Sequence, residues 1–178
     1  MALIKMAYVL NIILKNSLKK QLLEAFPRTP IPKEILLSAN TFSDDDISES
    51  VRKVLHLKSW DEILLNNWLR CTASTTTLMY FITPQAFHYY LPSLLAGVID
   101  DSGYFDWGVS ALLPYNKNHV RKSTWWTEYE SLFSTSQRQV IMSFLGYVEK
   151  ESGEMNESKY LAQTAILFWT DTMKTSLE

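Results

Sequence analysis

The chain has 178 residues, of which 47% are hydrophobic, and its 17 Lys and Arg against 19 Asp and Glu give a net charge of −2. This composition is typical of a folded domain and excludes a disordered or collagen-like chain. The single cysteine, Cys71, excludes an internal disulfide and a zinc site built from several thiolates. The slightly negative charge argues against direct binding to nucleic acid, which attracts concentrated positive charge.

Charge is distributed unevenly along the chain. Residues 1–33 contain six Lys and Arg and one acid, residues 34–106 contain four and ten, and residues 107–178 contain seven and eight. The three segments therefore carry +5, −6 and −1. The acidic middle segment is where we expect a basic partner to bind.

The first segment lacks the features of an export signal or a membrane span. The apolar run that follows Lys5 is interrupted by Asn11 and Lys15, and no stretch has the roughly 18 uninterrupted apolar residues of a spanning helix. We therefore expect a cytoplasmic protein that does not bind membranes. One alternative stays open, an amphipathic helix on a membrane surface with Lys15, Lys19 and Lys20 on its polar side.

Residues 3–26 have the period of a long amphipathic helix. Apolar side chains recur at the three- and four-residue steps of one helix face, at Leu3, Ala7, Leu10, Leu14, Leu18, Leu22 and Phe26. Pro27, Pro30 and Pro32 follow and remove backbone donors. Residues 27–42 are therefore predicted to be a proline-containing linker within the domain.

Two shorter helices are predicted between residues 43 and 69. Ser43 and the Asp triplet at 44–46 supply a cap and negative charge for the start of the first, which continues to about residue 58. Ser59 opens the second, in which one face is formed by Trp60, Ile63, Leu64 and Trp68. The β-branched run 72–77 is predicted to be a helix with a weak start, because no second strand-like run could pair with it.

A central helix is predicted over residues 83–98. Thr83 and Pro84 are a cap and first-turn pair, and large apolar residues recur behind them with helical spacing. Pro92 lies inside this pattern and removes one helical hydrogen bond, so we expect a kink or a break between Tyr90 and Ser93.

Two more helices are predicted near the end of the chain. Ser134 or Ser136 caps the first, whose buried stripe is predicted to be Val140, Ile141, Phe144, Leu145 and Val148. The second covers about residues 157–174, with a packing face of Tyr160, Leu161, Ala165, Phe168 and Thr172. The whole chain, residues 1–178, is thus predicted to be one all-α domain, a bundle of six to seven helices.

No constellation of catalytic or metal-binding residues is visible. His56, His88 and His119 lie in separate segments, and Cys71 has no activating motif beside it, so we expect a structural thiol. With five glycines in all, the chain also lacks the glycine-rich phosphate loops. We therefore expect a protein that is not an enzyme and needs no metal or cofactor.

Surface character is the remaining guide to function. Residues 99–108 combine acids and aromatic rings in a segment that Gly103 and Gly108 predict to be an exposed connection. Aromatic side chains in exposed loops are frequent energetic centres of protein interfaces. The predicted partner-binding residues are Asp44, Asp45, Asp46, Glu49, Asp100, Asp101, Tyr104, Asp106 and Trp107. Whether Phe105 and Trp107 face a partner or the core is left open.

The sequence at 83–92, Thr-Pro-Gln-Ala-Phe-His-Tyr-Tyr-Leu-Pro, resembles a bacterial family of small uncharacterised proteins. Trp-Asp-Glu-Ile at 60–63 and Gln-Arg-Gln-Val-Ile-Met-Ser-Phe-Leu at 137–145 extend the resemblance over residues 18–150, and the Tyr-Tyr-Leu-Pro turn is its most specific element. The resemblance supplies no catalytic residue. By type, the chain is also similar to the cytosolic immunity proteins that protect bacteria from contact-delivered toxins.

This likeness implies a specific function. We expect an immunity protein that blocks the active site of a cognate toxin, a basic nuclease domain, through complementary charge. The alternative is a regulatory or scaffold module that binds a cellular protein through the same face, and a third candidate is a small enzyme whose site follows no known motif. The oligomeric state is not predicted.

Overall fold

A computed structural model describes residues 2–37, 46–71, 74–114, 123–154 and 156–175 of the chain. In these ranges the secondary structure consists of nine α-helices and two short 3₁₀ turns, without a strand. The all-α prediction is confirmed, whereas the predicted number of six to seven helices is too low. The elements are α1 (Ala2–Ala25), α2 (Asp46–Leu55), η1 (Trp60–Glu62), α3 (Leu65–Cys71), α4 (Thr75–Leu78), α5 (Pro84–Asp100), η2 (Ser102–Tyr104), α6 (Phe105–Ser110), α7 (Thr124–Ser131), α8 (Thr135–Glu151) and α9 (Glu157–Thr175).

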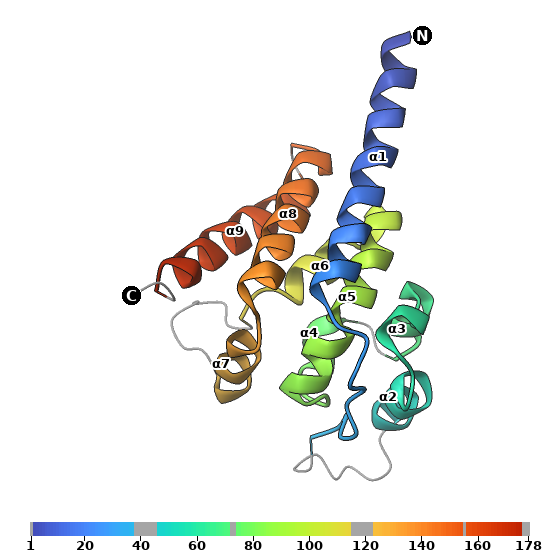
Figure 1. Cartoon of the computed structure of the whole chain (residues 1–178), viewed down its shortest axis with the longest axis vertical. Helices are drawn as coiled ribbons and strands as arrows, with labels where there is room; N and C mark the ends of the chain where they lie inside the picture. Colours follow the sequence, from blue (N-terminus) through green and yellow to red (C-terminus); the bar gives the residue numbers. More distant parts are fainter. Residues whose placement is uncertain (1, 38–45, 72–73, 115–122, 155, 176–178) are drawn as a thin grey trace.

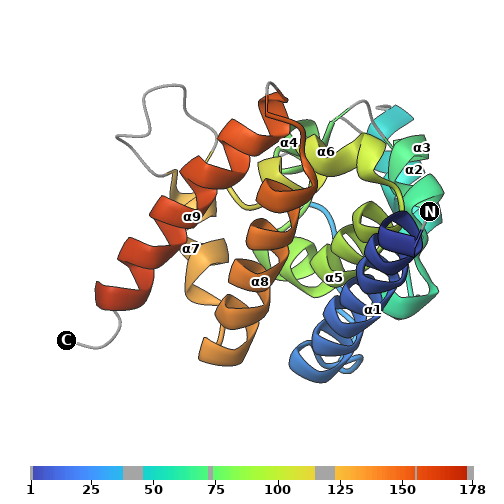
Figure 2. The same ribbon diagram turned by 90° about the horizontal axis from the view of Figure 1, so that it is seen from above.

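The helices pack around α5, the central buried element. Figures 1 and 2 show α1 beside α5 on one side of the molecule and α8 paired with α9 on the other, with α2 and α3 at the outer edge. Buried side chains of α1, α5, α8 and α9 belong to the same hydrophobic cluster. The linker is fastened to this core because the backbone N–H of Leu37 donates to Phe81 and that of Thr83 donates to Ile35.

Side-chain caps fix where several helices begin. The Thr83 hydroxyl accepts the N–H of Ala86 at 3.2 Å, as the sequence predicts for the start of α5. At the start of α8 the Ser134 hydroxyl accepts the N–H of Gln137, and the Gln137 amide oxygen accepts the N–H of Ser134. This reciprocal pair satisfies two donors that the first turn of a helix leaves free.

The central helix continues through Pro92 as one α-helix, so of the two outcomes expected between Tyr90 and Ser93, a kink or a break, the break does not occur. Pro92 and its neighbours are buried, and packing on several sides holds the helix together where the proline removes a hydrogen bond. The Ser93 hydroxyl donates to the Tyr90 carbonyl and accepts the indole N–H of Trp68, which ties α3 to this turn. The Tyr-Tyr-Leu-Pro sequence is therefore helical and forms no turn.

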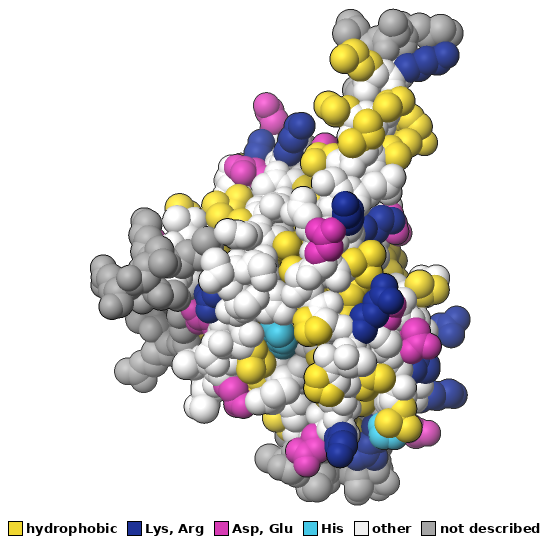
Figure 3. Space-filling model, in the orientation of Figure 1, with side chains coloured by type: hydrophobic (Ala, Val, Ile, Leu, Met, Phe, Trp, Pro, Cys, Tyr) yellow, Lys and Arg dark blue, Asp and Glu magenta, His cyan; other side chains and the backbone are white. Residues whose placement is uncertain are grey.

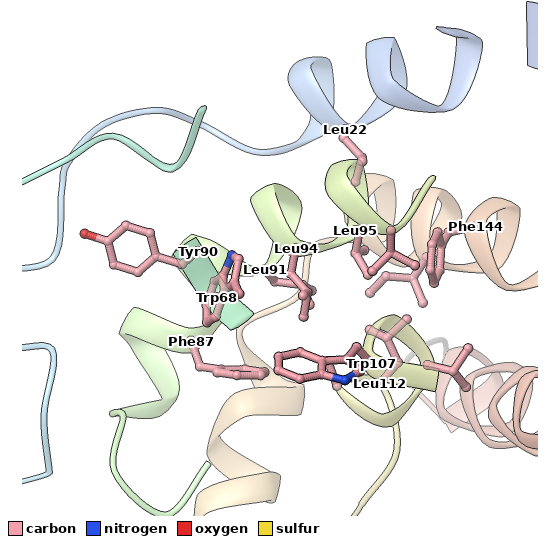
Figure 4. Close-up of a cluster of buried hydrophobic side chains, with 14 of the residues drawn as sticks. Leu22, Trp68, Phe87, Tyr90, Leu91, Leu94, Leu95, Trp107, Leu112 and Phe144 are labelled. Carbon is pink, nitrogen blue, oxygen red and sulfur yellow. The ribbon is translucent and has the colours of Figure 1, made fainter. Parts of the chain in front are cut away.

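Aromatic rings fill the core around Phe87 (Figure 4). The ring centroid of Phe87 lies 6.2 Å from that of Trp68, 5.6 Å from that of Trp125 and 5.4 Å from that of Tyr129, all in edge-on geometry. The rings come from α3, α5 and α7. Phe87 therefore joins three helices that are far apart in the sequence.

The segment 59–69 differs from the predicted single helix. Residues 60–62 form only a 3₁₀ turn, and Ile63 is extended before α3 begins at Leu65. Trp60, Ile63 and Trp68 are buried as expected, but Leu64 is 67% exposed. An extended residue breaks the helical period, so Leu64 points away from the face that its neighbours share.

Three other predicted features are also different in the structure. Residues 99–108 form the end of α5, η2 and most of α6, so Gly108 lies inside a buried helix and does not interrupt an exposed connection. In α9 Tyr160 is exposed, and the buried face includes Ala162 and Trp169. Helix α7 was not predicted, although Ser123 caps it by accepting the N–H of Trp126.

Gly108 allows α6 to pack closely on α5 and α8. A Cβ atom at this position would lie 2.8 Å from Phe144 Cζ and 3.1 Å from Val98 Cγ1, and Phe144 is fully buried. We therefore expect Gly108→Ala to lower the free energy of unfolding by about 1–3 kcal/mol. Gly146→Ala is the matched control, because a Cβ there meets no described atom within 4 Å and alanine favours helix by about 1 kcal/mol. Urea unfolding of both variants measures the change in the free energy of unfolding, and equal stabilities would contradict the close packing at Gly108.

Candidate functional site

A groove of about 430 Å³ lies between α1, η1, the start of α3 and the second half of α5. We call it the acidic groove. Its apolar lining comes from Leu22, Leu23, Trp60, Ile63, Leu64, Leu65, Ala96 and Gly97, and its polar lining comes from Lys19, Asp61, Asn66, Ser93, Asp100 and Asp101. Three aspartates against one lysine give the lining a net charge of −2.

The close approach of α3 to α5 shapes one wall of this groove. A Cβ atom at Gly97 would lie 2.6 Å from Leu65 Cβ, a distance that packed side chains do not tolerate. Only glycine at this position therefore lets the first turn of α3 contact the backbone of α5. Leu64, the residue before that contact, is left at the rim, where its apolar side chain is exposed.

Local contacts hold the three aspartates in place. Lys19 Nζ lies 2.8 Å from Asp100 Oδ1, and Arg28 Nε lies 2.9 Å from Asp61 Oδ2. The Asp101 carboxylate accepts the backbone N–H of Gly103 at 3.1 Å. Surface ion pairs of this kind add little stability, but they restrict where the carboxylates point.

Carboxylates beside apolar side chains in one groove suit the basic side chains of a protein. Lysine and arginine side chains have apolar stems that can cover leucine and tryptophan while their charged ends reach carboxylates. The acidic groove therefore matches the chemistry of a basic protein surface.

The predicted partner-binding residues are not all brought together. Asp100 and Asp101 line the acidic groove, whereas Asp46 and Glu49 are exposed on α2, which Figure 1 shows at the lower end of the molecule. Asp106 is exposed on α6 outside the groove lining. The predicted residues Asp44 and Asp45 lie outside the described part of the chain.

The two predicted aromatic contacts face the protein interior to different degrees. Trp107 is only 9% exposed and lies in the core (Figure 4), and its carbonyl accepts the hydroxyl of Thr75 at 3.1 Å. Tyr104 is half-buried and packs edge-on against Trp107 at 6.2 Å between ring centroids. The question left open for Phe105 and Trp107 is thereby answered, because Phe105 is buried as well and both rings face the core. We therefore leave Trp107 out of the proposed contact surface.

The sequence did not indicate several groove residues. Asp61 and Leu64 both lie in the helix that the sequence predicts after Ser59, with Leu64 on its apolar face. The Ser59 N–H donates to the Glu62 carboxylate at 2.7 Å, a capping contact that begins the turn η1, and the extended Ile63 that ends this turn has no local signal in the sequence.

A second hollow, of about 470 Å³, has the opposite charge. Its lining residues are Lys33, Glu34, Ile35, Leu36, Arg52, Lys53 and His56, which together carry +2 with the histidine neutral. The cations come from the linker and α2. The two hollows therefore attract surfaces of opposite sign.

Cys71 is a buried thiol of the core. Burial raises the pKa of the Cys71 thiol to about 11, and the thiol donates to the carbonyl of Asn67 at 3.3 Å. At neutral pH it is therefore protonated and suits the structural role predicted for it. Among the described residues, no group of three His, Cys, Asp or Glu side chains could hold a metal ion.

His88 links α5 to α8 inside the molecule. Its ring lies 4.5 Å from that of Phe133 and 5.8 Å from that of Phe26, and its Nε2 is 3.2 Å from Gln137 Oε1. Burial lowers its pKa from the ordinary value of 6.5, against a smaller opposing effect of the Gln137 hydrogen bond. The unfolded chain therefore binds a proton at a higher pH than the folded protein does.

This difference predicts a pH-dependent stability. As the pH falls below 6.5, the unfolded state gains the proton first, so the free energy of unfolding should decrease, by at most about 1.4 kcal/mol per pH unit. The decrease should be smaller in His88→Gln, which keeps a polar side chain but cannot titrate in this range. Urea unfolding at pH 7 and pH 5.5 measures both slopes, and equal slopes would contradict the role assigned to His88.

The chain belongs to a family of unknown function (DUF6714), whose model matches residues 14–173. No curated protein and no solved structure matches the chain.

Proposed function

We propose that this member of the family is an immunity protein that acts in the cytoplasm, where it binds a cognate bacterial toxin domain and blocks its active site. The single observation that carries the proposal is the acidic groove, whose lining combines apolar side chains with three aspartates that local contacts hold in place. A basic nuclease domain is the expected partner, because its active site must attract the phosphates of nucleic acid and is therefore positively charged.

The aspartates and the apolar side chains of the groove have different effects on binding. Complementary charge accelerates encounter, and burial of apolar side chains at the centre of an interface slows release. An inhibitor of a toxin needs both, since it must capture the toxin before damage occurs and then retain it.

A growth assay tests this function. The chain would be co-expressed with the toxin domain that co-purifies with it from its native cell, and survival would be scored. The wild type should protect, and the combined variant Asp61→Asn, Asp100→Asn, Asp101→Asn should fail, with an affinity at least about tenfold weaker. Folding should survive, because the lost ion pairs are at the surface.

The matched control changes three acids that lie outside the groove. Asp46→Asn, Glu49→Gln and Asp106→Asn remove the same charge from exposed positions on α2 and α6. This control should protect as the wild type does. Protection lost only in the control would place the contact on those acids, and a co-purifying partner that is not toxic would favour the regulatory or scaffold module.

A further inference from the structure

The first half of α1 extends beyond the body of the molecule and exposes hydrophobic side chains. Figure 1 shows this end of the helix rising above the other elements, and Figure 3 shows hydrophobic side chains gathered on it. We call these residues the outer face of α1: Met6, Tyr8, Val9, Leu10, Ile12 and Ile13, which are 40% to 73% exposed. The sequence predicted Leu10 and Leu14 in the buried stripe, but Leu10 is 60% exposed and Leu14 only half-buried, whereas Leu18 is buried.

The outer face points away from the core. At about 100° per residue, its six side chains cover roughly 200° of the helix circumference, centred opposite Leu18 and Leu22, which pack on the body. A helix that docks on a protein core needs an apolar stripe only somewhat wider than about 100°. α1 thus carries one apolar face for its own core and a second, broader one that none of the described residues covers.

Charge indicates what covers the outer face. The first acidic residue of the chain is Glu24, so residues 1–23 contain four lysines and no acid. Lys19 is held by Asp100, and Lys20 is exposed with its Nζ 3.7 Å from Glu24 Oε1, while Lys5 is exposed near the tip. Pairing of two outer faces from two copies would bring together two segments that contain lysines and no acid before Glu24, and a basic protein would be repelled in the same way.

From this charge complementarity we propose that the outer face of α1 binds an anionic lipid surface. The apolar residues of the first half would enter the boundary between headgroups and acyl chains, and Lys20 would contact headgroup phosphates beside them. The body would stay clear of the lipid, because it packs on the opposite side of the helix. Such binding is peripheral, since no described helix has the length and apolar character that crossing a membrane requires.

The proposed association combines two weak signals and should therefore be reversible. Insertion of a short apolar face contributes a salt-independent part, and the lysines contribute a part that salt screens. This inference is independent of the acidic groove. A membrane-surface helix is the alternative that the sequence left open. Here the inserted residues are the exposed ones in the first half of α1.

A site-specific fluorophore tests the proposal in the full chain. Ile13→Cys, labelled with an environment-sensitive dye, would be mixed with phosphatidylcholine vesicles that contain phosphatidylglycerol or lack it. Cys71 is buried with a raised pKa, and the wild-type chain serves to check that it takes up no dye. The expected result is a blue shift only with phosphatidylglycerol, and Lys5→Gln with Lys20→Gln should weaken binding about thirtyfold.

A matched label position on α9 and three further outcomes test the proposal. Leu167→Cys carries the same label on α9, where the side chain is 69% exposed, and its emission should not change. An equal shift at Leu167, an equal shift with pure phosphatidylcholine, or no shift with any vesicle would overturn the proposal. A shift without vesicles that grows with protein concentration would also overturn it, in favour of self-association.

Discussion

Phe87→Ala should lower the free energy of unfolding by about 3–5 kcal/mol, the cost of removing a large ring from a core that cannot fully collapse around the gap. Phe87 is fully buried, and its ring contacts rings on α3 and α7. The change therefore removes contacts between three helices at once. Urea unfolding followed by tryptophan fluorescence measures the loss, and Phe87→Leu should retain more of the stability.

Tyr160→Ala is the control for this change. It also removes an aromatic ring, but Tyr160 is 62% exposed on α9. Substitutions at such positions usually change stability by less than about 0.5 kcal/mol. Similar losses in the two variants would mean that Phe87 does not have the central position described for it.

Positive charge placed in the acidic groove should abolish partner binding. Leu23→Arg combined with Leu64→Arg changes the charge of the lining from −2 to 0 and removes two exposed apolar contacts. We expect the affinity for a basic partner to fall about a hundredfold, because both the attraction and the apolar contact are lost. Folding should be retained, since neither side chain is buried. Titration calorimetry with the co-purified partner measures this.

The matched control adds the same two charges elsewhere. Tyr160→Arg combined with Leu167→Arg changes two exposed residues of α9, which does not line the groove. Its affinity should remain within about twofold of the wild type, since general changes in net charge are screened at physiological salt. A comparable loss of affinity in both variants would show that net charge alone governs binding, and the groove would then not be the binding site.

Helix positions could be predicted from the sequence wherever a cap and an apolar stripe coincide. Thr83 accepts a free N–H of the first turn of α5, which begins at Pro84 as predicted, and Ser134, one of the two predicted caps, does the same at the start of α8. The buried stripe of α8 is correct as well. Local hydrogen bonding and local periodicity determine these features, and both are visible in a short window of sequence.

Features that depend on tertiary contacts were not predictable in this way. Leu64 has the spacing of a buried residue, but one extended residue before it turns its side chain outward. Trp107 stands among acids and glycines that suggest an exposed connection, yet Gly108 lets α6 approach Phe144, and Trp107 is buried. A glycine that permits close packing and a glycine that ends a helix look the same in a sequence.

The candidate site was predictable only in part for the same reason. Asp100 and Asp101 were identified from the acidic character of their segment. Their partners in the groove come from α1 and from residues 60–66, and the contact between Gly97 and Leu65 that brings α3 there has no local signature. Conversely, the acids of α2 have the right charge but lie on a different part of the molecule.

The salt dependence of association tests whether the acidic groove is the surface that captures a basic partner. The association rate constant of the co-purified partner would be measured at several salt concentrations for the wild type and for the combined Asn variant of Asp61, Asp100 and Asp101. Groove capture predicts slower association and a weaker dependence on salt in the variant, because charges near an interface act mainly on encounter. An unchanged association rate constant with an unchanged salt dependence in the variant would contradict capture of the partner by the groove.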